Sequence, residues 1–289
     1  MKRNLDLFRQ HFGSVAELEG AVNAPMKRET NRALCRTFAG RPSREWYGPG
    51  NTSSQDVERF MRDGYMAGAA IVDALYESVA ATLPRALDHR RKRVRGDIGD
   101  ELDIHAVNRG DAFRAWETTK RQIRYGSGLV RIVADVGGNA GMRASVLQWR
   151  GVAALALSRS LTRAGYSVEI IAADAGRGYS NGGGAARQLT SVTVKPRHSP
   201  VDTAMIAATI CLPGFFRLPL FKAIVLAADL QGVDANSGLG QALDVDSVIE
   251  TPEKVAQVVT PTSICDESSA REWLRRAHAL LQHSTVSKG

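Results

Sequence analysis

The sequence predicts an α/β protein in which a doubly wound, mainly parallel sheet follows a helical N-terminal region. Three observations lead to this fold class. Residues 129–174 show the pattern of a strand, a glycine-rich loop, a long helix and a second strand. After residue 174, further short apolar segments alternate with stretches of helical periodicity, which is typical of sheets wound with helices. The first 125 residues carry mainly helical periodicity.

The segment 129–174 is the most informative part of the chain. Residues 129–134 are apolar and partly β-branched, which suits a strand covered on both faces, and Asp135 closes it. Glycines then interrupt both kinds of element, and apolar residues recur at helical spacing from 145 to 164. A second apolar strand, 168–173, ends at Asp174. This βαβ unit predicts a parallel strand pair with a right-handed crossover.

The first 128 residues predict helices separated by loops. Ser14, with Glu17 three residues later, has the spacing of a capping box. Asp100 or Asp103 is a candidate cap further along the chain. The expected elements are two short helices in 1–24, a loop at 40–54 that contains Trp46 and Tyr47, a helix over 54–83, a basic linker at 85–95 and a helix over 107–125.

The remainder of the chain predicts alternating elements around a sheet. We expect residues 1–95 to form the helical region with its basic linker, and residues 96–289 to form the α/β domain. The expected elements are a flexible loop at 175–186, strands at 189–195, 223–227 and 255–260, helices at 202–211 and 263–282, and an irregular segment at 229–254.

Composition narrows the class of protein. The chain has 289 residues, a formal net charge of +8 and ordinary hydrophobic content. No apolar run of 18 residues and no signal-peptide pattern is present, so we expect neither a membrane span nor export. The three cysteines lie far apart without metal-ligand spacing, which favours reduced thiols and a cytoplasmic location.

Candidate binding residues gather where the predicted strands end. Ligands of wound α/β sheets usually bind beyond the carboxyl ends of the strands. We therefore expect one rim to contain the end of the first core strand, its loop, the end of the second core strand and the turn at 196–203. The rim residues expected to bind a ligand are Gly137, Gly138, Gly141 and Asp174, beside Asp135 and Asn139.

These motifs resemble a von Willebrand factor A-like domain. The resemblance rests on the Asp-ending strand, the small-residue loop, the helix with WRG and the strand GYSVEII. The preceding basic segment and GDELDI resemble the lead-in to such domains in cobaltochelatase and nitric-oxide-reductase-activation proteins. The resemblance covers about residues 95–285 and implies a domain that binds a protein partner. Residues 1–90 resemble uncharacterised phage-encoded proteins of tailed phages.

In that family a metal-ion-dependent adhesion site uses Asp-x-Ser-x-Ser, a later Thr and a further Asp. The resemblance carries the first position to Asp135, the second Ser to Asn139 and the Thr to Thr203, with Asp202 beside it. Gly137 stands where the first Ser belongs. Glycine offers no side-chain oxygen and an Asn oxygen is uncharged, whereas Mg²⁺ needs a tight shell of hard oxygens. The resemblance therefore implies a degenerate site that binds Mg²⁺ weakly or not at all, and no other cofactor.

Three functions stay open. The first is a non-catalytic module that holds a protein partner through the rim. The second is nucleic-acid binding through the basic run and the Arg-rich segments 114–124 and 271–276. The third is a metal-dependent enzyme that uses Asp135, Asp174 and Asp202. The residues of the second hypothesis are Arg90, Arg91, Lys92, Arg93 and Arg95.

Overall fold

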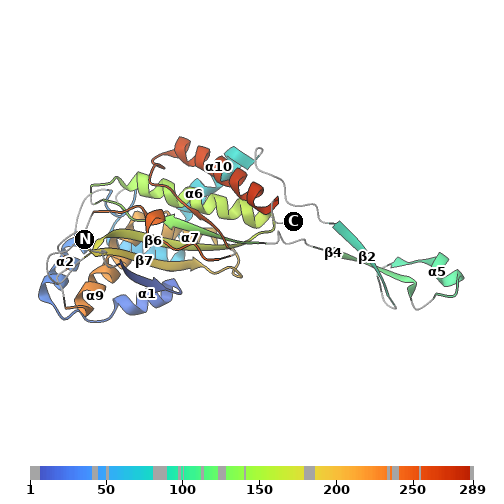
Figure 1. Ribbon diagram of the computed structural model, residues 1–289, viewed down its shortest axis with the longest axis horizontal. Helices are drawn as coiled ribbons and strands as arrows, with labels where there is room; N and C mark the ends of the chain where they lie inside the picture. Colours follow the sequence, from blue (N-terminus) through green and yellow to red (C-terminus); the bar gives the residue numbers. More distant parts are fainter. Residues whose placement is uncertain are drawn as a thin grey trace, which may run out of the picture.

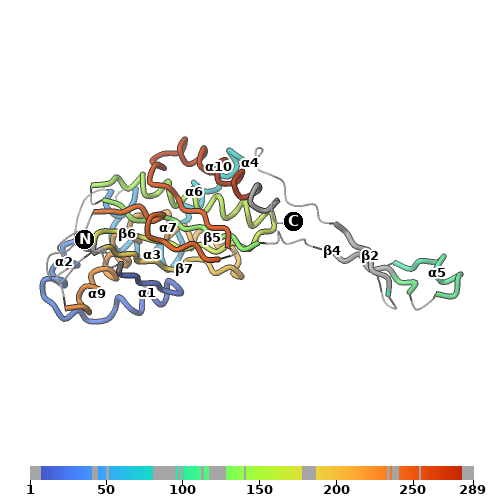
Figure 2. The backbone as a smooth tube through the Cα atoms, viewed as in Figure 1, coloured from blue at the N-terminus to red at the C-terminus, as the bar shows by residue number. Residues whose placement is uncertain are grey.

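The structure of the protein is a computed structural model (Figures 1 and 2). The structure describes most of the chain. The described residues are 7–40, 45–49, 52–80, 90–96, 99, 101–111, 114–122, 128–139, 141–178, 186–232, 235, 241–253 and 255–286.

A five-stranded sheet forms the centre of the molecule, with strand order β1-β7-β6-β5-β8 (Figure 1). Three neighbouring pairs are parallel, and only β6 and β7 run antiparallel. The α/β class expected from the sequence is confirmed. The strands are β1 (Leu7–Phe12), β5 (Leu129–Asp135), β6 (Ser167–Gly178), β7 (Ala186–Lys195) and β8 (Ala256–Val259).

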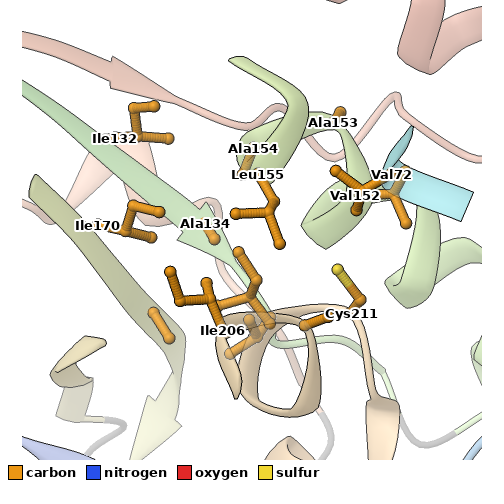
Figure 3. Packing of buried hydrophobic residues seen from close by; sticks show 14 of the residues in the cluster. Val72, Ile132, Ala134, Val152, Ala153, Ala154, Leu155, Ile170, Ile206 and Cys211 are labelled. Carbon is orange, nitrogen blue, oxygen red and sulfur yellow. The ribbon is translucent and has the colours of Figure 1, made fainter. Parts of the chain in front are cut away.

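The βαβ unit supplies the main core. Helix α6 (Ala144–Arg163) connects β5 to β6, and its buried face contains Val152 and Leu155. They belong to one core cluster with Ile132 and Ile170 on one face of the sheet. Figure 3 shows Leu155 on the side of these sheet residues and Val152 beside Val72. On the other face, Val133 belongs to a separate cluster with residues of the segment 243–249. Both faces of the central strands are therefore covered, which is why their sequences are mostly apolar.

The remaining helices surround this unit. Helices α4, α7 and α10 pack against α6, whereas α1 and α2 pack against α9. The elements are α1 (Val15–Val22), α2 (Glu29–Ala39), α3 (Ser54–Asp63), α4 (Met66–Ala80), α5 (Ile104–Asn108), α7 (Thr203–Ile210), α8 (Pro213–Phe215), the π-helical turn η2 (Phe216–Leu220), α9 (Phe221–Leu230), the 3₁₀ turn η3 (Val245–Ser247) and α10 (Glu267–Val286).

The N-terminal region differs from the expectation. The first expected helix is strand β1, which pairs in parallel with β7 at the edge of the sheet. The boundary expected at residue 95 is therefore wrong, because the N-terminal region supplies a strand to the main sheet. The helix expected over 54–83 is two helices, because Gly64 adopts φ 90° between α3 and α4. The Ser14 cap is confirmed, since its side chain accepts from the Glu17 N–H.

Two further elements differ in type. Residues 223–227, expected as a strand, lie in helix α9. This helix is buried on nearly every side, so its sequence lacks the alternation of an amphipathic helix. The helix expected over 107–125 ends at Asn108, and strand β4 (Trp116–Gln122) follows; Asp103 caps α5 by accepting from His105 N and Ala106 N.

A second, three-stranded sheet lies away from the main body (Figure 1). Its order is β2-β4-β3, with β2 (Arg90–Gly96) and β3 (Glu101–Leu102) both antiparallel to β4. Part of the expected basic linker is thus strand β2; residues 85–89 lie outside the described part. Among the described residues no single helix is long and apolar enough to span a membrane, and α7 passes that test only together with Pro213–Leu230 across a 57° bend.

Candidate functional site at the carboxyl ends of the strands

The direction of each strand decides which candidate residues meet. Strands β5, β6 and β8 are parallel, so their carboxyl ends share one edge of the sheet. Strand β7 runs the other way, so the turn that follows it lies at the opposite edge, where the Ser167 hydroxyl donates to the Arg197 carbonyl at 3.2 Å. The expectation that the turn 196–203 joins the rim is therefore wrong.

Asp202 and Thr203 consequently lie apart from Asp135. Asp202 is the N-cap of α7, and its Oδ1 accepts from the Met205 N–H at 3.1 Å. The ligand set suggested by the resemblance (Asp135, Asn139, Asp202 and Thr203) is not assembled. The three-carboxylate set of the enzyme hypothesis is not assembled either, because Asp202 belongs to the other edge. Among the described residues, no group of three or more His, Cys, Asp or Glu could hold a metal ion.

Asp135 is fixed in place at the end of β5. It is 3% exposed, and its Oδ1 accepts from the Gly137 N–H at 3.1 Å. Its own N–H donates to the Thr260 hydroxyl at 2.8 Å, which links β5 to the end of β8. Its Oδ2 lies 3.6 Å from Arg150 Nη1. Each of these contacts holds the carboxylate within the protein rather than presenting it to a ligand.

Arg150, from α6, is the cation of this cluster. It is 1% exposed and donates to the carbonyl of Gly137 at 2.9 Å and to that of Thr262 at 3.2 Å. It therefore ties the glycine loop to the segment after β8. Burying a guanidinium is costly unless its donors are bonded and a counter-charge is near. Here Nη1 and Nη2 donate and Asp135 lies near, whereas the buried Nε donates to no described residue.

Asp174 lies beside this cluster in β6 and is 5% exposed. Its carboxylate sits against the Cα of Gly137, at a distance that leaves no room for a side chain there. No described residue donates a hydrogen bond to it. Asp174 is thus a buried carboxylate that accepts no hydrogen bond from the described residues, whereas Asp135 accepts one, from Gly137, and lies beside Arg150.

The pKa values of the two carboxyl groups, Asp135 and Asp174, are both raised. Burial raises the pKa of Asp135 to about 7, against the opposing effect of Arg150 and of the Gly137 N–H. Burial also raises the pKa of Asp174 to about 7, and the negative charge of Asp135 adds to the effect. With both ionised, the negative charges of Asp135 and Asp174 lie beside the positive charge of Arg150, and Asp244 adds a further negative charge near Asp135. The pair therefore favours the arrival of a proton or another cation.

A pocket that is lined in part by Asp174 opens at this rim. Its apolar wall comes from α2, the loop after it, η2 and α9, and includes Phe38, Trp46 and Phe221. Its polar side comes from the sheet and the glycine loop, and includes Asn139 and Gln188. A concave, mostly apolar site with a few convergent polar groups is the usual form of a binding pocket.

The loop residues expected at the rim have distinct roles. Gly138 and Asn139 line the pocket, whereas Gly141 is exposed beyond it. The Asn139 Oδ1 accepts from the Ala242 N–H at 2.9 Å, so this oxygen holds the segment 241–243 over the end of β6. Sequence reasoning missed this segment, together with Arg150 and Thr260. The sequence signal that could have indicated Thr260 is a polar residue after the last strand. No pattern in the sequence indicated that Arg150 is buried.

The basic run forms part of a β-ribbon. Strand β2 pairs with β4 so that Arg91 lies opposite Arg121 and Lys92 opposite Lys120. Arg90, Arg93 and Arg95 occupy the other basic positions of β2.

The comparisons with known proteins identify the family. The model of a family described as a domain of unknown function (DUF7192) matches residues 2–282, and the chain belongs to this family. No curated protein and no solved structure matches the chain.

Proposed function

We propose that this member of DUF7192 is a non-catalytic binding module that holds a protein partner at the carboxyl-end rim. The observation that carries the proposal is the pocket at this rim, where aromatic walls meet the buried carboxylate of Asp174, which accepts no hydrogen bond from the described residues. The pocket mouth is formed by the exposed residues Gln241 and Ala242. A neighbouring chain can therefore place a side chain into the pocket while it packs on the surrounding loops.

The surrounding polar groups favour binding over chemistry. The hydrogen bonds of the other polar groups at the rim connect loops to one another. These groups belong to Asp135, Arg150, Thr260 and Asn139. General acid–base catalysis needs a titratable group free to approach a reacting atom, usually with a second group poised beside it. Asp174 alone meets the first condition among these five residues.

The proposal extends to the relationship with A-like domains. It is supported by Asp135 at the end of β5, by the glycine loop and by α6, which stand in the order that the resemblance implies. The proposed module differs from that family in its metal site. Gly137 supplies no oxygen, and the Asn139 oxygen already accepts a bond, so we propose that the rim works without a resident ion.

A matched pair of substitutions tests the proposed function. Ala242→Trp places an indole at the pocket mouth, whereas Ala279→Trp places one on the exposed face of α10. Both variants and the wild type are immobilised, and the proteins they retain from a lysate of the source cell are quantified. We expect one specific protein to be retained by the wild type and by Ala279→Trp but to be lost at least tenfold in Ala242→Trp. Equal retention by all three would contradict the proposal.

A second candidate function is nucleic-acid binding through the ribbon β2–β4. It is favoured by the register that sets Arg91 opposite Arg121 and Lys92 opposite Lys120. A two-stranded ribbon fits the major groove of DNA, and basic residues supply the phosphate contacts. This function uses a different part of the chain and is tested separately.

A further inference from the structure

We infer that the rim pocket receives a cationic side chain of the partner, a lysine ammonium or an arginine guanidinium, with the Asp174 carboxylate as its counter-ion. The inference rests on the proposed function and adds the chemistry of the group that is recognised. It starts from a contrast between buried carboxylates. Asp229 accepts from the N–H groups of Lys27 and Arg28 and from the Asn31 amide, whereas Asp174 accepts from no described residue.

The local charge balance selects a cation. Asp135 and Asp174 each carry a negative charge when ionised, and Asp244 adds a further negative charge near Asp135. Arg150 pairs with Asp135, at 3.6 Å, so a positively charged group beside Asp174 would offset a charge that the described residues leave unpaired. In a site of low polarity, such a pair is stronger than it would be in water.

The arginines of the pocket wall leave this position open. Arg217 donates to the carbonyls of Trp46 and Met142, both at 2.5 Å, and its guanidinium lies over the Trp46 ring at 4.1 Å. Arg177 contributes to the pocket wall from β6, but its side chain is exposed. No salt bridge joins either arginine to Asp174 within the described part of the chain.

The shape of the pocket fits a long side chain with a charged end. Lysine and arginine place a charge at the end of an apolar stem of three or four methylene groups. The walls above Asp174 include Phe38, Phe221 and Ile224, which suit such a stem. The Gln188 side chain lines the polar side of the pocket and carries an amide oxygen that can act as a further acceptor.

The same groups provide poorer coordination for a divalent metal ion. Mg²⁺ requires near-octahedral oxygen coordination. Gly137, which lies against Asp174, has no side-chain oxygen to offer an ion. The Asn139 side-chain oxygen already accepts a hydrogen bond from the Ala242 N–H. An ammonium group needs only two or three acceptors in less strict geometry.

Calorimetric titration at pH 8 tests the inference with small probes. The probes are n-butylammonium and n-butylguanidinium chloride, with n-butanol as a neutral control and MgCl₂ as the competing class of cation. The proteins are the wild type, Asp174→Asn and Asp246→Asn, an exposed control. We expect saturable binding of one or both cationic probes to the wild type and Asp246→Asn, and at least tenfold weaker binding to Asp174→Asn.

Several results would overturn the inference. Binding of n-butanol as tight as that of the cations would mean that the pocket is only apolar. Saturable Mg²⁺ binding that requires Asp174 and displaces the probes would identify a metal site. Undiminished probe binding by Asp174→Asn would place the cation elsewhere, and should that variant fail to fold, Ala242→Trp provides a second test because it must also lose the probes.

The two proposals fail separately. Partner retention that is lost in Ala242→Trp but unchanged in Asp174→Asn would keep the protein-binding function and refute the cationic group. Probe binding that requires Asp174, together with partner retention that is unaffected by Ala242→Trp, would keep the cation pocket and refute the protein-binding function.

Discussion

The carboxylate of Asp174 occupies the space that a side chain at Gly137 would need. A Cβ built on Gly137 would lie 1.9 Å from Asp174 Oδ1, far inside van der Waals contact. Glycine at this position is therefore a condition for Asp174 to lie where it does. The resemblance to A-like domains treats Gly137 as a lost metal-ligating serine; the structure gives a steric reason why no serine fits.

The first prediction concerns this contact. Gly137→Ala should destabilise the protein by about 1–3 kcal/mol, because either the loop or the carboxylate must move. Adding Asp174→Ala should recover a large part of that loss, since it removes the clashing atoms. Urea unfolding of the two single variants and the double variant gives the coupling energy. Gly20→Ala is the control, because nothing lies within 4 Å of its Cβ; additive effects of the two site substitutions would refute the contact.

The second prediction concerns pH. The pKa values of Asp135 and Asp174 are raised from 3.8 to about 7, so the folded chain binds more protons than the unfolded chain between these values. The resulting stabilisation is complete below pH 4 and is lost as the pH rises through 7. It amounts to at most about 4 kcal/mol for each carboxyl group.

The variant Asp174→Asn isolates this effect because its side chain stays neutral. The free energy of unfolding of the wild type should fall more steeply from pH 5 to pH 8 than that of the variant. Asp246→Asn, at an exposed position, should keep the slope of the wild type. Urea unfolding at the two pH values measures the slopes, and a variant as steep as the wild type would show that Asp174 is ionised at both.

The third prediction concerns the buried cation. Arg150→Met should cost about 3–5 kcal/mol, because it leaves Asp135 without its counter-charge and frees the Gly137 and Thr262 carbonyls. Arg159→Met on the same helix is the matched control. Arg159 pairs with the half-exposed Asp73, and such pairs contribute about 0–1 kcal/mol. Thermal melts compare the two, and equal losses would remove the special role of Arg150.

The fourth prediction concerns the β-ribbon. If it binds nucleic acid, the logarithm of the affinity for duplex DNA should fall linearly with the logarithm of the salt concentration. The double variant Arg91→Gln/Lys92→Gln should reduce that slope by about 2, one for each lost phosphate contact. Arg59→Gln/Arg62→Gln on α3 should leave the slope unchanged. Fluorescence anisotropy provides the affinities, and the absence of salt-dependent binding by the wild type would refute this function.

The central βαβ unit could be predicted because its signals are local. The apolar strands β5 and β6, the glycine loop and the periodicity of α6 each lie within one continuous segment. The position of Asp135 at the end of β5 followed from the same reasoning, whereas β6 continues past Asp174 to Gly178. The Ser14 and Asp103 caps were also visible, since capping depends on residues two or three positions apart.

The features that the sequence did not reveal depend on long-range pairing. Strand β1 forms only against β7, about 180 residues later in the chain. The antiparallel direction of β7 sends Asp202 to the opposite edge, and no local pattern encodes that direction. Helix α9 is apolar on nearly all sides because neighbouring helices surround it, so its sequence resembled a strand. The pocket itself joins α2, η2, α9, strands β6 and β7, and loop residues from separate parts of the chain.

The central claim is that a protein partner contacts the rim, and site-specific photocrosslinking tests it most directly. A photoreactive phenylalanine analogue is placed at Gln241, on the mouth of the pocket, and in a second variant at Arg275, on the exposed face of α10. We predict that irradiation joins one defined protein to the Gln241 variant and not to the Arg275 variant, and that Asp174→Asn weakens the yield. Crosslinks of equal yield at both positions, or at Arg275 alone, would contradict the claim.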